Sequence, residues 1–222
     1  MLNKWNRASD RGFSFYVHAI VYFETPLNAQ VLLVRHGSHD EVGRLLSGRS
    51  GIVLNATGYT EVARLSAYLV DFGVSAVFSS PRPRAVETAW GIAAALDLEV
   101  DIEPGLDEID FGAWTGRAFA DLEGDPEWQH WNQARGRARV PGGGETMAEV
   151  TSRAVEAVER IAGLSGTIAC VSHCDVIRAL VAHYLGLDLD RLLSFDVDPA
   201  SISIITLGSG APRVVAVNRI AA

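Results

Sequence analysis

The chain has 222 residues, of which 48% are hydrophobic, and this length and composition suit one α/β domain that buries its core without disulfides or metals. Its net charge of -8 argues against a nucleic-acid or anionic-membrane partner, because either would call for a broad basic face. An anionic substrate must therefore be attracted by a local cluster of arginines.

The first 29 residues are interpreted as an N-terminal extension, and residues 30–222 as a single domain. Three basic residues precede a short apolar stretch over residues 13–23, which faintly imitates a secretory signal. We expect an extension on a cytoplasmic protein; a signal peptide and a start codon assigned too early stay open as alternatives. No run of about 18 apolar residues is present, so no transmembrane helix is predicted.

Strands and helices alternate in the first half of the chain. The short apolar run over residues 30–35 predicts a buried strand, and a long loop follows to about residue 56. Helical spacing of apolar residues predicts a helix over 57–72 that ends at Gly73. The next predicted elements are a strand at 75–78, a helix that Ser80 caps and Pro81 begins, and a strand at 99–102.

Residues 105–116 mix turn formers, acids and aromatics, which is typical of a structured functional loop. Two modest helices, 117–122 and 126–134, are expected to form a cap over one edge. The remaining predicted elements are a helix that Glu145-Thr146 introduce and that ends at 162, a strand at 167–171, a helix at 175–185, and strands at 201–207 and 214–217.

This alternation predicts an α/β fold with a mostly parallel, doubly wound sheet flanked by helices, together with the small helical cap. Three strand exits carry residues suited to phosphate: Arg35 and His36 at the first, Arg84 beyond the second, and His173 after the strand at 167–171. Ligands in such sheets bind beyond the carboxyl ends of the strands. We therefore expect these four side chains to share one pocket.

Five motifs, in this order, resemble the histidine phosphatase superfamily, also called the phosphoglycerate-mutase-like family. They are Arg35-His36-Gly37, the segment 79–89 (SSPRPRAVETA), the segment 106–116 (LDEIDFGAWTG), the segment 143–146 (GGET) and Ser172-His173. A lone Arg-His-Gly would mean little, but five ordered motifs in one chain are hard to obtain by chance.

The resemblance implies that His36 attacks phosphorus and becomes a phosphohistidine, while Arg35, Arg84 and His173 hold the phosphoryl group. Phosphoryl transfer depends mostly on positioning and on positive hydrogen-bond donors around the equatorial oxygens, and the arginine fork suits that task. The neighbouring guanidinium charges are expected to lower the pKa of His36 and keep it neutral. Glu108 is placed by the motif as the general acid and then the base. No metal or other cofactor is required.

The acids beside Glu108, Asp107 and Asp110, are expected to raise its pKa by like-charge repulsion, and Asp107 is a fallback candidate for its role. Further motif residues are expected to contact substrate: Gly37, Glu145 and Ser172.

Two departures from the family pattern are visible. Many members have threonine two positions after the motif glycine and an asparagine a few residues later, whereas this chain reads SHDEV over residues 38–42. The candidates to replace the missing donor, or to contact substrate, are Ser38, His39, Arg44, Ser47 and Arg49. Where the family commonly has glycine after its second histidine, this chain has Cys174, a substrate-contact candidate that narrows the pocket or does nothing. Its thiol and that of Cys170 are expected to be free.

We favour a metal-independent phosphomonoester hydrolase that acts on a small phosphorylated metabolite. A phosphomutase is the alternative within the family, although the segment before the Gly-Glu motif is short and its basic residues are only Arg135, Arg137 and Arg139. Trp114, Trp128 and Trp131 are expected to pack rather than stack on substrate, although the region from Trp128 to Trp131 would set the choice of ester.

Two readings from other classes stay open. One is a zinc site built from His36, His39, Asp40 and the run His173-Cys174-Asp175, which would leave the paired arginines unexplained. The other is a phosphoester-binding module without turnover. No nucleic-acid or membrane partner is expected, and a homodimer is left open.

Overall fold

The computed structural model describes residues 28–221, and residues 1–27 and 222 lie outside that description. The predicted N-terminal extension therefore falls almost wholly outside the described residues, and Ala29 is already the first residue of a strand. Within residues 28–221, no helix combines the length and the apolar character that crossing a membrane requires.

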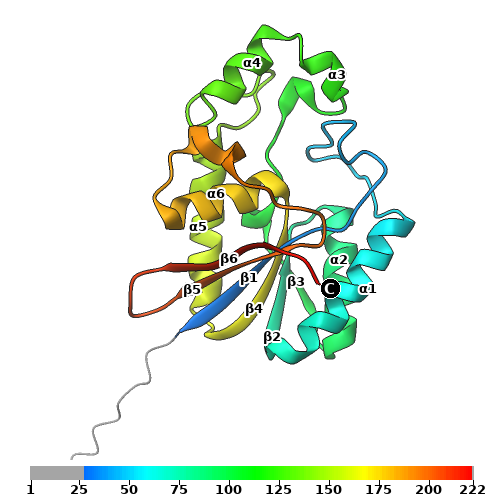
Figure 1. The fold of residues 1–222 in the computed structure, drawn as a ribbon, viewed down its shortest axis with the longest axis vertical. Coiled ribbons are helices and arrows are strands. Elements are labelled where there is room, and N and C mark those ends of the chain that lie inside the picture. The colour runs from blue at the N-terminus through cyan, green and yellow to red at the C-terminus, as the bar shows by residue number, and fades with distance from the viewer. Residues whose placement is uncertain (1–27, 222) are drawn as a thin grey trace, which may run out of the picture.

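The core of the fold is a six-stranded sheet in the order β3-β2-β4-β1-β5-β6 (Figure 1). The first four strands in that order are parallel, β5 pairs antiparallel with β1, and β6 pairs antiparallel with β5. The predicted fold class, a mostly parallel sheet flanked by helices, is confirmed. The strands are β1 (Ala29–Arg35), β2 (Val74–Ser79), β3 (Val100–Ile102), β4 (Gly166–Ser172), β5 (Ile202–Leu207) and β6 (Arg213–Arg219).

Helices cover both faces of the sheet. The α1/α2 pair packs on the face that Leu32 and Val34 present, while α5 and α6 pack on the opposite face, which receives Val31 and Leu33. Because both faces of β1 are buried, its sequence is continuously apolar rather than alternating. The α-helices are α1 (Ala56–Leu69), α2 (Pro83–Leu96), α3 (Phe119–Leu122), α4 (Pro126–Gln133), α5 (Met147–Ala162) and α6 (Cys174–Leu185).

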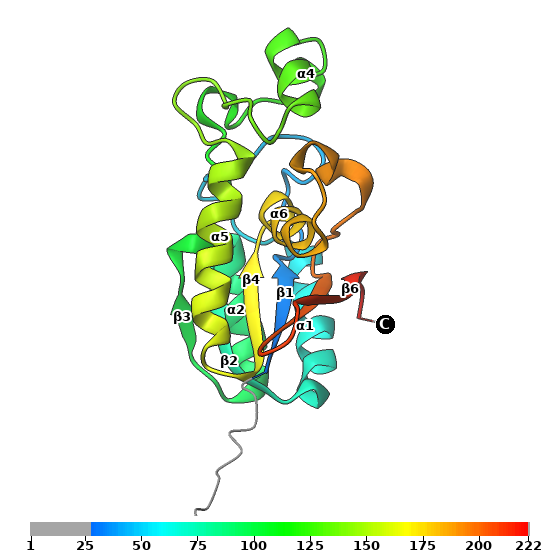
Figure 2. The same ribbon diagram turned by 90° about the vertical axis from the view of Figure 1, so that its left-hand side faces the viewer.

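The short helices α3 and α4 form the cap, which lies beyond the carboxyl ends of β1 and β4 at the top of both ribbon views (Figures 1 and 2). Trp114 and Trp131 are buried beneath the cap and meet edge to face, so the prediction that they pack is confirmed. Trp128 stacks on Trp131 but is only half-buried and lines the cavity described below.

Helix α2 begins two residues later than predicted. Arg82 is its N-cap residue and Pro83 occupies its first turn, so Ser80 does not cap it. The serine hydroxyl is used elsewhere, in a bond to the ring of His173. The 3-10 helices also went unpredicted, the longest being Leu189–Ser194 after α6. Cys170 and Cys174 are both unpaired, as expected.

Candidate active site

A cavity of about 280 Å³ opens at the carboxyl ends of the parallel strands. The two central strands end in register there, because Arg35 pairs with Ser172 and the His36 amide donates to the Ser172 carbonyl at 3.1 Å. This pairing brings together residues more than 130 positions apart in the chain. Residues from the predicted set that line the cavity are Arg35, His36, His39, Ser47, Arg84, Glu108 and Cys174.

His36 is held in a single orientation. Its Nδ1 lies 2.8 Å from the carbonyl oxygen of Gly37, which can only accept, so Nδ1 carries the ring hydrogen and Nε2 keeps its lone pair. Burial lowers the pKa of His36 well below its usual value, and the charges of Arg84 and Arg35 lower it further. The expected direction of this shift agrees with the structure, but burial is the larger cause. The ring is therefore neutral, with an available nitrogen.

Two arginines line the cavity together with His36. Arg84 is 1% exposed, and its Nε donates toward His36 Nε2 at 3.2 Å, while its NH2 donates to the carbonyl of Gly48 at 2.7 Å. Arg35 donates through NH1 to the Val197 carbonyl at 2.6 Å, and its buried Nε has no partner within residues 28–221. Because an unpaired buried donor is costly, this Nε is a free binding position for an anion.

His173 lies behind this cluster, with its ring centre 5.2 Å from that of His36 and no exposed surface. Its Nδ1 is 3.2 Å from Arg84 NH2, and its Nε2 is 2.7 Å from the hydroxyl of Ser80. Burial, then the charge of Arg84, lowers the pKa of His173. The sequence analysis interpreted Ser80 as a helix cap, because serine before proline is typical of a helix start. Its bond to His173 was not predicted, since the two residues are 93 positions apart.

Glu108 faces the same cluster from the loop after β3. Its Oε2 lies 3.7 Å from Arg84 NH2 and 3.6 Å from His173 Nδ1. The pKa of Glu108 is raised to about 7; burial is the main cause, the charge of Arg84 opposes the rise, and Asp175 adds to it. The predicted cause, repulsion from adjacent acids in the loop, is therefore replaced by desolvation.

Asp107, the fallback candidate for the acid, is occupied by another arginine. Its two carboxylate oxygens accept from Arg82 Nε at 2.8 Å and Arg82 NH2 at 2.9 Å, and it does not line the cavity. A cation near the start of a helix is unfavourable, and the Asp107 carboxylate offsets the charge of Arg82 at the N-cap of α2. Of these two loop acids, Glu108 is the one that lines the cavity together with His36.

Several predicted contacts hold the loops instead of lining the cavity. Ser38 donates to Glu61 on α1 through its hydroxyl at 2.8 Å and through its backbone amide. Gly37 donates to Thr88, and a Cβ at Gly37 would lie 2.9 Å from the Gly58 carbonyl, so only glycine fits this approach to α1. The Ser172 hydroxyl donates to the Leu106 carbonyl at 2.7 Å. Arg44 is exposed and lies outside the cavity lining.

An arginine on α5 fastens the loop that carries Glu108. Arg153 donates to the backbone carbonyls of Gly105, Asp107 and Glu108, and it also pairs with Glu145. Arg49, a predicted substrate contact, likewise donates to the Glu108 carbonyl and to Glu145. Glu145 thus bridges Arg49 and Arg153 and does not line the cavity. Nothing local in the sequence marks this role of Arg153, because the carbonyls that it holds are 45 to 48 residues away.

The zinc reading required histidine, cysteine and aspartate ligands to converge. Within residues 28–221, no three or more histidine, cysteine, aspartate or glutamate side chains form a group that could hold a metal ion. Asp40 accepts from Asn55 at 2.9 Å, and His36 Nε2 faces the guanidinium of Arg84.

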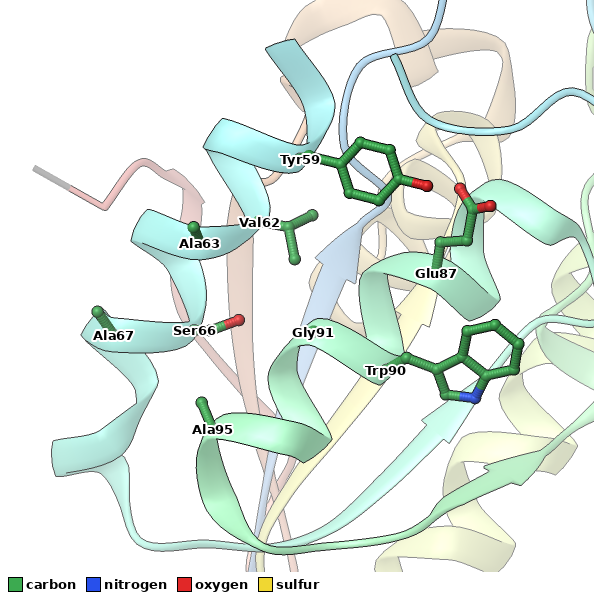
Figure 3. A pocket seen from close by; sticks show the side chains of 9 residues that line it. All are labelled: Tyr59, Val62, Ala63, Ser66, Ala67, Glu87, Trp90, Gly91 and Ala95. Carbon is green, nitrogen blue, oxygen red and sulfur yellow. The ribbon is translucent and has the colours of Figure 1, made fainter. Parts of the chain in front are cut away.

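A larger cavity, of about 680 Å³, lies between α1 and α2 and does not coincide with this cluster (Figure 3). Figure 3 shows Tyr59, Glu87 and Trp90 around small residues of the two helices, with no histidine or arginine among the lining residues. Its size makes it prominent, but its lining contains no cationic side chain for a phosphoryl group and includes the acid Glu87. The smaller cavity at the strand ends is therefore the candidate active site.

Comparison with protein families assigns the chain. A model of the histidine phosphatase superfamily (branch 1) matches residues 31–220, which contain every residue of the cluster described above. The chain belongs to this superfamily.

This histidine phosphatase superfamily member is similar in sequence to proteins from bacteria. It is 37% identical over 196 residues to Bifunctional protein Rv2228c of Mycobacterium tuberculosis, covering 86% of this chain and 54% of that one. The chain thus spans about half the length of this relative. It is 32% identical over 182 residues to Phosphoserine phosphatase 1 of Hydrogenobacter thermophilus, covering 79% and 85% of the two chains.

Among solved structures, the YhfR protein of Bacillus stearothermophilus superposes with a TM-score of 0.81 at 28% identity, over 86% of this chain and 98% of that one. A relative named as a phosphatase thus shares sequence with this superfamily member, and the YhfR structure shares its fold.

The Arg153 contacts carry a testable stability effect. Replacing Arg153 by methionine removes the side-chain donor of the Gly105 and Asp107 carbonyls and leaves the Glu108 carbonyl and Glu145 with Arg49 alone of the two arginines. We therefore expect a loss of about 3 kcal/mol in the free energy of unfolding. Arg160→Met is the matched control on the same helix, because Arg160 is 62% exposed and pairs with Glu103 at the surface. That change should cost less than about 1 kcal/mol. Denaturant unfolding measures both, and equal losses would contradict the anchoring role.

Proposed function

We propose that this protein is a phosphomonoester hydrolase that works through a phosphohistidine on Nε2 of His36. The observation that carries the proposal is the neutral His36 ring, whose Nδ1 is fixed by the Gly37 carbonyl and whose Nε2 faces the guanidinium of Arg84. A nucleophile at phosphorus needs an unprotonated nitrogen beside positive donors, and this arrangement supplies both. The incoming phosphoryl group would replace the Arg84 hydrogen bond on that nitrogen.

In the first step, the lone pair of His36 Nε2 forms a bond to phosphorus, and the bond from phosphorus to the ester oxygen breaks. Arg35 and Arg84, which line the cavity, are the donors for the phosphoryl oxygens, while His173 positions the Arg84 fork from behind through its Nδ1. The departing oxygen takes a proton from Glu108, which a pKa of about 7 keeps substantially protonated near neutrality. The alcohol leaves, and a phosphohistidine and the Glu108 carboxylate remain.

In the second step, the Glu108 carboxylate removes a proton from a water molecule that attacks phosphorus. The bond between phosphorus and Nε2 breaks, inorganic phosphate forms, and Glu108 is protonated again for the next cycle. One buried carboxyl group thus serves both steps in opposite protonation states. No step in this sequence requires an additional co-reactant.

The positions of the three arginines before the Gly-Glu motif favour hydrolysis over a mutase reaction, in which a second phosphorylated molecule would receive the phosphoryl group. Arg137 is exposed and faces Asp190, while Arg139 pairs with Glu149. Neither lines the cavity. Arg135 does line it, but it bonds to Asp175 and Asn132 and lies over the ring of Trp131. A second phosphate would find few free donors there.

The substrate we propose is a small phosphorylated metabolite whose alcohol portion fills the rest of the 280 Å³ cavity. That portion would meet an apolar side under the cap and a polar side on α6, where Asp175 and Arg178 lie. The apolar lining residues are Val42, Leu45, Leu46, Phe111, Phe119, Trp128 and Leu193.

A panel of phosphomonoesters, assayed with and without a chelator, tests this function. We expect phosphate release from at least one small ester, unchanged by the chelator. Stoichiometric zinc in the purified protein, lost in His36→Ala together with activity, would support the metal site instead. Transfer of phosphate to an added phosphoglycerate faster than to water would support the mutase.

Glu108→Gln tests the proton donor. The variant should lower kcat by about 10²-fold to 10⁴-fold while phosphate still binds, because glutamine keeps the shape but transfers no proton. In the wild type, kcat/KM should fall as pH rises above about 7, where Glu108 loses its proton, and that alkaline decline should be absent in the variant. The acid-side decline should lie well below pH 6.5, where His36 becomes protonated. An unchanged alkaline decline in the variant would assign that titration to another group.

A further inference from the structure

A third histidine lies beside the proposed nucleophile. His39 is 6% exposed, lines the cavity, and has its ring centre 5.3 Å from that of His36. It belongs to the loop that follows β1, whereas His173 reaches His36 from the end of β4. The two imidazoles therefore approach the nucleophile from different elements.

The hydrogen bond that His39 makes to its own loop fixes its tautomer. The backbone amide of Glu41 donates to His39 Nδ1 at 3.3 Å, so Nδ1 must keep its lone pair. In a neutral ring the hydrogen then sits on Nε2. That nitrogen is left as a donor for a ligand in the cavity.

The neutral form of the ring is also the favoured one. The pKa of His39 is lowered to about 4, first by burial and then by the charge of Arg84, while Glu41 acts in the opposite direction. A neutral donor binds an anion without adding a positive charge, which would lower the pKa of Glu108. This distinguishes His39 from the arginines, whose charge the cluster already contains.

The loop offers few other donors in this position. Val42 lines the cavity with an apolar side chain, and Ser38 is turned toward Glu61 on α1. The Ser47 hydroxyl lines the cavity farther along the loop. The buried imidazole next to His36 is therefore the loop side chain best placed to meet a group held on that ring.

We propose that His39 is a phosphate-binding residue of this enzyme, with its Nε2 hydrogen donated to a phosphoryl oxygen of the ester and then of the phosphohistidine. The proposal rests on the proposed function, since it takes the phosphoryl group to be on His36. It assigns the task to a side chain three positions after the nucleophile, in place of a carboxamide farther along the loop.

Two amide substitutions separate the two nitrogens of the ring. Glutamine at position 39 places its amide nitrogen near Nε2 of the histidine, so His39→Gln keeps the proposed donor and loses the bond to Glu41. Asparagine places its amide oxygen near Nδ1, so His39→Asn keeps the loop bond and loses the donor. The pair is matched in polarity and chemistry.

We expect His39→Asn to lower kcat/KM by about 10-fold to 100-fold, which is the usual worth of one hydrogen bond to a charged group. Inhibition by vanadate and by inorganic phosphate should weaken by a similar factor. His39→Gln should stay within about fivefold of the wild type in both measurements. Thermal unfolding of the two variants shows whether the loop is disturbed.

The reverse order, with His39→Gln impaired and His39→Asn active, would overturn the proposal and make His39 a loop-positioning residue. Equal activity in both variants would overturn it as well. Failure of the His39 proposal can be distinguished from failure of the proposed function, because calorimetry measures phosphate affinity without turnover. A protein that turns over no ester, yet binds phosphate more weakly only in His39→Asn, would keep the anion contact and refute the hydrolase.

Discussion

His36→Ala is expected to reduce turnover by roughly 10³-fold to 10⁶-fold, a loss typical for removal of a nucleophile that acts as part of a unit. The ring is the group in the cavity with a fixed, neutral nitrogen facing a buried guanidinium, and alanine offers no lone pair in its place. The remaining donors should still hold phosphate, so inhibition by phosphate should weaken far less than turnover does.

A covalent adduct is the sharper measurement for His36. Rapid quenching of the wild-type protein with an ester labelled in its phosphoryl group should trap an acid-labile phosphohistidine, and His36→Ala should trap none. His130→Ala is a suitable control, since His130 is exposed on α4 and does not line this cavity. Turnover without any trapped adduct in the wild type would point to direct attack by water, and undiminished turnover in His36→Ala would refute the nucleophile.

Arg84→Lys is expected to lower kcat/KM by about 10²-fold to 10³-fold, although it keeps a positive charge. The guanidinium reaches His36 Nε2 through Nε, and the Gly48 carbonyl and His173 through NH2, so one planar fork serves three partners. A lysine ammonium cannot reproduce that geometry. Phosphate inhibition should weaken with turnover, because both need the same fork.

Arg84→Met adds a readout that does not depend on activity. The charge of Arg84 is one of the causes that lower the pKa of His36, so its removal should raise that pKa, and an NMR titration of the ring hydrogens measures the change. Arg137→Met, which removes an exposed charge outside the cavity, should leave the titration where it is. A His36 titration unmoved by Arg84→Met would mean that burial accounts for the whole shift.

The fold could be predicted well from the sequence because its signals are local. The run of apolar residues in β1 and the helical spacing in α1 report burial on one or both faces without reference to distant segments. The start of α2 could not be predicted to the residue, since Pro81 and Pro83 are equally suitable as the first helical residue. In the structure, Arg82 is the N-cap residue, and the Ser80 hydroxyl bonds to the ring of His173 instead.

The sequence by itself determined which strand ends carry Arg35, His36, Arg84 and His173, and that these ends meet at one edge of the sheet. Only the tertiary structure decided which side chains enter the cavity and what each is bonded to. It turned Ser38 toward α1, used Glu145 to bridge Arg49 and Arg153, and placed His39 in the cavity lining with its Nδ1 bonded to the amide of Glu41. The physical reason is that motifs and periodicity are set by neighbours in the chain, whereas burial, side-chain direction and pKa depend on packing between segments that lie tens of residues apart.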